Sequence, residues 1–176
     1  EKYFNKLVDI LTKESIDGIL VAPSNDLEFL MGFSPHMDER FQGLFVTSRG
    51  DYFYVVPKLN YEEIQNVLGD GGKIYPWDDG EGFLGKVGQA LKDFDLLNKK
   101  IAVNGSVPAV STINIKNNYD VEFVDGKVLI EELTIIKDNE EIENLKMAAK
   151  LADEVFEDIV KFIRPGIQEK DIRDRI

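Results

Sequence analysis

Polar side chains that could do chemistry gather in one segment of the chain, residues 32–40 (GFSPHMDER). The segment holds the only histidine of the sequence, His36, followed by Asp38, Glu39 and Arg40. A histidine changes its charge near neutral pH, and an arginine can bind a carboxylate through two parallel hydrogen bonds. These residue types suit the recognition of a peptide terminus. An open alternative is a solvated loop in which Glu39 and Arg40 form an ion pair within the domain.

A second polar stretch, residues 78–85, offers two weaker possibilities. Asp78, Asp79 and Glu81 could form a carboxylate-only metal site, but their spacing lacks the calcium-loop pattern, so an acidic surface turn is the favoured interpretation. Residues 80–85 (GEGFLG) match the GxGxxG pattern of phosphate-binding loops. We expect no nucleotide there, because no solid strand is predicted before the glycines and the neighbouring carboxylates would repel a diphosphate.

The composition excludes several classes of site and partner. The formal net charge of −12, from 33 acidic and 21 basic residues, makes nucleic acid and anionic membrane surfaces poor partners. Without cysteine the chain forms no disulfide or thiolate metal site, and a single histidine excludes histidine-rich zinc patterns. No apolar run approaches the roughly 20 residues that span a bilayer, and no signal peptide is recognisable. We expect a soluble, cytoplasmic protein without a complete catalytic set.

Strands and helices alternate along the first 130 or so residues. Three segments repeat apolar residues at helical spacing and predict helices: residues 3–14, 59–68 and 82–94. Five segments are apolar or rich in β-branched residues and predict strands: residues 19–22, 43–47, 52–56, 101–103 and 121–124. The second and third of these strands flank a turn and predict a hairpin, a strand stub is expected at residues 74–75, and residues 104–118 carry no clear pattern. This order predicts an α/β domain with a mixed β-sheet flanked by helices.

The longest predicted helix lies late in the chain, at residues 138–163, with apolar residues along one face. Asp138 and Glu141 match a variant of the capping box at its start. A Pro-Gly pair ends this helix, and another amphipathic helix follows it to the end of the sequence. Because the apolar face of that last helix has no predicted partner, we interpret the chain as one domain, residues 1–132, followed by the beginning of another, residues 133–176.

Five motifs, in the same order along the chain, resemble the N-terminal domain of the pita-bread metallopeptidases, the family of prolidase, Xaa-Pro aminopeptidase and creatinase. They are residues 16–21 (IDGILV), residues 25–33 (NDLEFLMGF), the pair Glu39 and Arg40, residues 133–142 (LTIIKDNEEI) and residues 165–169 (PGIQE). The sequence departs from the family pattern at three positions. Thr134 replaces the usual arginine, Gln168 replaces a common threonine, and Phe29 stands where tyrosine is frequent.

The resemblance implies a creatinase/prolidase N-terminal domain with a ribonuclease-H-like layout, followed by a linker and the first helices of a truncated pita-bread domain. In this family the pita-bread domain carries catalysis, and two Asp, one His and two Glu bind two divalent metals, such as Mn, Co or Zn. Those ligands would lie beyond Ile176. The resemblance therefore implies no catalytic residue, metal ligand or cofactor within this chain, which we expect to be inactive by itself.

For function, the resemblance implies the non-catalytic N-terminal domain of an Xaa-Pro dipeptidase or aminopeptidase, which would support homodimerisation and substrate access. The full-length enzyme would hydrolyse the bond before proline in peptides. His36, Asp38, Glu39 and Arg40 are then expected to form a substrate-entrance loop that reaches the active site of the partner subunit. Two alternatives stay open: a pita-bread module that has lost its metals and binds peptides or histones, and a creatinase-like hydrolase of a small amidino compound.

Overall fold

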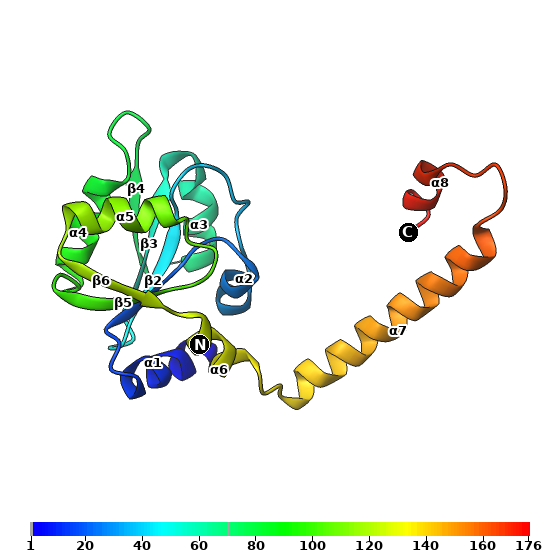
Figure 1. The fold of residues 1–176 in the computed structure, drawn as a ribbon, viewed down its shortest axis with the longest axis horizontal. Coiled ribbons are helices and arrows are strands. Elements are labelled where there is room, and N and C mark those ends of the chain that lie inside the picture. Colours follow the sequence, from blue (N-terminus) through cyan, green and yellow to red (C-terminus); the bar gives the residue numbers. More distant parts are fainter. Residues whose placement is uncertain (1, 70) are drawn as a thin grey trace. The chain divides into compact units, whose positions relative to one another are not determined.

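The structure is a computed structural model, and it describes residues 2–69 and 71–176. The chain divides into two compact units, the first ending at Ile135 and the second beginning at Ile136. The first unit is an α/β domain built around one β-sheet, and the second unit consists of helices (Figure 1). Within the described residues, no helix is both long enough and apolar enough to cross a membrane.

The sheet of the first unit is mixed and has the strand order β4-β3-β2-β1-β5-β6. Its strands are β1 (Gly18–Val21), β2 (Gly43–Thr47), β3 (Tyr52–Pro57), β4 (Lys73–Trp77), β5 (Lys99–Val103) and β6 (Val121–Asp125). β2 runs antiparallel to β3, as the predicted hairpin requires, and also to β1, whereas the other neighbours pair in parallel. The prediction of an α/β domain with a mixed sheet is confirmed.

Helices cover both faces of this sheet. One face packs against α1 (Lys2–Lys13), α2 (Asn25–Met31), α3 (Tyr61–Leu68), which a 3-10 turn (Lys58–Asn60) precedes, and α6 (Lys127–Thr134). The other face packs against α4 (Leu84–Asp93) and α5 (Ala109–Asn118). Strand β1 shows why both faces are covered: Ile19 and Val21 belong to the first core and Leu20 to the second, because successive side chains of a strand point to opposite faces.

Several local predictions differ from the structure. The patternless segment 104–118 contains helix α5, which buries only Ser111 and Ile115 and is rich in Asn, Thr and β-branched residues of low helix propensity. Helix α6 was not predicted. The stub at residues 74–75 is a full strand, since β4 pairs with β3 over residues 73–77. Helix α2, whose first turn is capped by the Ser24 side chain, fills a stretch to which no helix was assigned above.

The second unit contains α7 (Asn139–Phe162) and a short helix, α8 (Glu169–Arg173). The predicted capping box is present: the Glu141 amide donates to Asp138 Oδ1 at 2.9 Å, and the Asp138 amide donates to Glu141 Oε2 at 2.8 Å. The long helix is therefore confirmed at nearly its predicted limits. That these helices begin a catalytic domain stays a prediction.

Asn104 joins the ends of the two central parallel strands. It follows β5, is only 2% exposed, and its Oδ1 accepts a hydrogen bond of 3.0 Å from the Ala22 amide just after β1. Its Nδ2 donates to Ser24 Oγ at 3.1 Å and to Asp26 Oδ2 at 2.9 Å, at the start of α2. One buried side-chain amide thus satisfies polar groups of three residues between the end of β1 and the start of α2, which fixes where the chain leaves the sheet.

We expect Asn104→Ala to lower the free energy of unfolding by about 1–3 kcal/mol, because the buried Ala22 amide would lose its acceptor. Urea denaturation of the chain measures this change. Asn117→Ala is the matched control, since Asn117 lies exposed on α5 and should change the stability little. Equal stability of the two variants would contradict the role given to Asn104.

Candidate functional site

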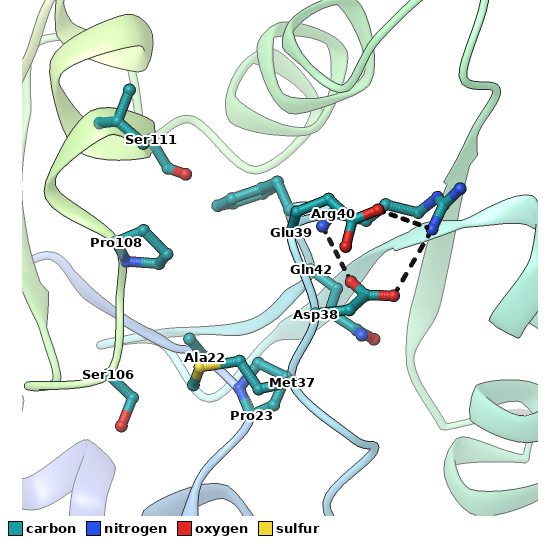
Figure 2. A pocket seen from close by; sticks show the side chains of 12 residues that line it. Ala22, Pro23, Met37, Asp38, Glu39, Arg40, Gln42, Ser106, Pro108 and Ser111 are labelled. Carbon is teal, nitrogen blue, oxygen red and sulfur yellow. Dashed lines mark hydrogen bonds and ion pairs between the residues drawn. The ribbon is translucent and has the colours of Figure 1, made fainter.

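A cavity of about 250 Å³ lies where the chain leaves β1 and β5. Its lining comes from three segments: residues 22–23 after β1, residues 37–42 before β2, and residues 106–111 around the start of α5. Figure 2 shows the α5 segment on one side of the cavity and residues 37–42 on the other. Three of the predicted site residues, Asp38, Glu39 and Arg40, line it. The structure therefore adds a second wall to the predicted loop.

Arg40 is engaged by carboxylates of its own domain. Its Nε and one terminal nitrogen donate to the two oxygens of Asp79 at 3.1 and 3.2 Å, which is a bidentate pair. The other terminal nitrogen lies 3.3 Å from Glu39 Oε1 and 3.7 Å from Asp38 Oδ2 (Figure 2). Three carboxylates thus surround one guanidinium, and this edge of the cavity carries an excess of negative charge.

The loop that carries His36 is anchored at both ends. Gly32 ends α2 with φ 71°, in the left-handed region that favours glycine, and Ser34 Oγ accepts a hydrogen bond of 2.9 Å from the Ser24 amide. At the other end, the Arg40 amide donates to Asp38 Oδ1 at 2.8 Å. His36 itself is exposed and does not line the cavity. The structure thus separates His36 from the other three predicted site residues.

The acidic turn after β4 forms ion pairs with neighbouring segments. Lys58 donates to Asp78 Oδ2 at 3.1 Å, and this hydrogen bond, with a second from the Gly80 amide, holds the pKa of Asp78 below its usual value. Asp79 pairs with Arg40 as described above. The interpretation as an acidic surface turn agrees with these contacts. Among the described residues, no group of three or more His, Asp or Glu side chains is arranged to hold a metal ion.

One prediction about the glycine pattern in this turn was wrong. We expected no solid strand before residues 80–85, but β4 ends at Trp77, directly before the turn. The amides of the turn are nevertheless used internally. Gly80 donates to the Asp78 side chain, and Glu81 and Gly82 donate to the Asp78 carbonyl. A phosphate would need these amides free, so the geometry still does not favour a nucleotide.

Two polar residues of the cavity were missed by the sequence analysis. Ser111 is 6% exposed, and its hydroxyl points into the cavity without a hydrogen-bond partner among the described residues (Figure 2). Gln42 is 4% exposed, and its Oε1 is buried with no hydrogen-bond donor in the part of the chain that the structure describes. No sequence signal marked Ser111, because its segment showed no periodicity. Gln42 lies directly before β2, and this polar position next to a buried strand was the sequence feature that could have indicated it as a cavity residue.

The chain resembles known proteins over nearly its whole length. The family model of the creatinase/prolidase N-terminal domain matches residues 4–136. An uncharacterized peptidase of Staphylococcus haemolyticus is 27% identical over 172 residues, which cover 97% of this chain and 47% of that peptidase. The chain therefore spans about half the length of the curated relatives it matches.

Solved structures give the same assignment. A dipeptidase from Pyrococcus horikoshii is 30% identical, with a TM-score of 0.82, and the match covers 96% of this chain and 46% of the dipeptidase. A prolidase from Thermococcus sibiricus is 25% identical, with a TM-score of 0.84, and the match covers 98% of this chain and 47% of the prolidase. The family expected from the five sequence motifs is confirmed. This chain belongs to the creatinase/prolidase N-terminal domain family.

Proposed function

We propose that this chain is the non-catalytic N-terminal domain of a cytoplasmic Xaa-Pro dipeptidase or aminopeptidase, and that it supports homodimerisation and substrate access. One observation carries the proposal: the chain matches the creatinase/prolidase N-terminal domain over residues 4–136 and covers about half of a dipeptidase and of a prolidase. In this proposal the other half of the longer protein hydrolyses the bond before proline.

The two divalent metals expected in such an enzyme, Mn, Co or Zn, do not fit the residues of this chain. A two-metal centre needs several hard ligands that converge on one point, and the described residues offer no group of three. We therefore assign no catalytic step to this chain. The metal ligands would lie beyond Ile176, in the part of the relatives that this chain does not cover.

The geometry of residues 32–40 supports a role in substrate access. The loop is held in shape at Gly32, Ser34 and Arg40, yet it presents His36 to the surface. A fixed loop with an exposed polar side chain can contact a substrate without first losing much conformational entropy. In a homodimer, this loop would face the active site of the partner subunit and recognise a peptide terminus there.

The first test concerns the reaction itself. We expect the longer protein, this chain with its native continuation, to hydrolyse Xaa-Pro dipeptides in the presence of Mn²⁺ and to lose activity with a chelator. The 176-residue chain alone is the control and should show no turnover. Amino-acid release measures both. Absence of turnover with any divalent metal would contradict the proposal and favour the metal-free peptide- or histone-binding module, whereas turnover of an amidino compound alone would favour a creatinase-like enzyme.

The second test concerns the loop. In the longer protein, we expect His36→Ala and Arg40→Ala each to raise KM by about three- to tenfold with little change in kcat, as expected for lost substrate binding. Asp79→Asn is the control, because it weakens the hold on Arg40 but keeps the guanidinium. An equal effect of Arg40→Ala and Asp79→Asn would mean that Arg40 only fixes the loop. Unchanged kinetics in both alanine variants would exclude a role in substrate access.

A further inference from the structure

The cavity occupies the position at which open α/β sheets commonly bind ligands. β1 and β5 are parallel neighbours in the sheet. The chain leaves β1 through α2 towards β2 on one side, and it leaves β5 through α5 towards β6 on the other. Two connections that diverge in this way leave a crevice outside the carboxyl ends of the strands, which is where ligands bind in such sheets. The cavity is lined by Ala22 and Pro23, which follow directly after β1, and by residues of the connection from β5 to α5, beginning at Ser106.

The wall formed by α5 offers hydrogen-bond donors. The residue before the helix is Pro108, so no side chain caps its first turn. The Ser111 and Thr112 amides donate to the Pro108 carbonyl, which leaves the amides of Ala109 and Val110 without an acceptor among the described residues. Ser111, on the same turn, is the second and independent feature: the residue is 6% exposed, and its hydroxyl points into the cavity and has no hydrogen-bond partner in the described part of the chain (Figure 2). This wall suits a carbonyl or carboxylate oxygen.

The opposite wall attracts a positive charge. Asp38 and Glu39 both line the cavity, and Glu39 is the more accessible of the two, with its side chain 81% exposed. The Arg40 guanidinium donates two hydrogen bonds to Asp79, so its positive charge is balanced within the domain. The overall charge of −12 acts in the same direction. A ligand with an ammonium group is therefore favoured over a simple anion.

The rest of the lining is apolar and of limited size. Most of its contact area comes from small or apolar side chains, namely Ala22, Pro23, Met37, Phe41, Pro108 and Val110. Met37 is 46% exposed, and its flexible thioether can adapt to different shapes. The volume of about 250 Å³ lies below the range of roughly 300–1,000 Å³ of pockets for drug-sized ligands. The space suits one amino-acid side chain rather than a large cofactor.

We propose that this cavity binds an α-amino-acid unit with an apolar side chain, either as a free amino acid or as the first residue of a peptide. The side chain occupies the apolar lining and the ammonium group lies against Asp38 and Glu39. The carbonyl or carboxylate oxygen accepts hydrogen bonds from Ser111 and the first turn of α5. Binding at this site does not depend on hydrolysis by the longer protein, so it can be tested separately.

The test is calorimetric titration of the 176-residue chain with four probes that share one side chain: L-leucine, L-leucinamide, N-acetyl-L-leucinamide and isovalerate. We expect leucine or leucinamide to bind about tenfold or more tightly than the acetylated probe, because a charge-assisted contact is lost on acetylation. Preference for leucinamide identifies a peptide N-terminus, and preference for leucine identifies a free amino acid. Equal binding of the acetylated probe, strongest binding of isovalerate, or no binding by any probe would overturn the proposal.

The position of the site is tested by two variants and by NMR. Ser111→Ala should weaken binding about five- to tenfold, through loss of one hydrogen bond. Ser48→Ala is the matched control, because Ser48 follows β2 at the end away from the cavity and does not line it, so its loss should leave the affinity unchanged. In the unaltered chain, amide shifts should concentrate at Ala22, Phe41 and Ser111. Shifts confined to other segments, or equal losses in both serine variants, would refute this location.

Discussion

The burial of β1 is the constraint on which the first unit depends. All its residues are buried, and it pairs with β2 on one side and with β5 on the other. A strand that is apolar on both faces requires helices on both faces, and the two cores meet this requirement. Removal of either layer would expose Ile19 and Val21 or Leu20. The central strand therefore determines the layered architecture independently of the loops.

The same strand also determines where a site can form. Its antiparallel neighbour β2 begins at the edge where β1 and the parallel strand β5 end, so three chain segments meet there. Backbone polar groups at such an edge need partners. The Asn104 side chain provides an acceptor for the Ala22 amide, and the backbone amide of Asn104 donates to the carbonyl of Leu20 at 3.1 Å. The cavity lies beside these hydrogen bonds of Asn104, at the ends of the central strands of the sheet.

Family membership and local geometry fit together. Relatives of about twice the length are a dipeptidase and a prolidase, and the described residues carry no metal-binding cluster. In the proposed function, this domain contributes surfaces rather than chemistry. Here one surface is the exposed loop around His36, and another is the cavity between Asp38 and Ser111. Both present charge or hydrogen-bond donors of the kind that peptide termini require.

The sequence by itself determined the elements whose signals are local. The hairpin, the first helix and the capped helix α7 follow from periodicity, turn residues and the Asp138 capping box, all within short stretches. The family motifs could also be recognised in the sequence, including the pair Glu39 and Arg40. The residue types of the candidate loop were therefore predictable from sequence.

Tertiary structure alone decided what those residues contact. The partner of Arg40 is Asp79, and the cavity sets Asp38 opposite Ser111; each pair is far apart in sequence and is brought together by strand order. Helix α5 likewise owes its place to burial of Ile115 against β6 and α4 rather than to propensity. Contacts between distant residues depend on how the sheet is ordered, and no short stretch of sequence contains that information.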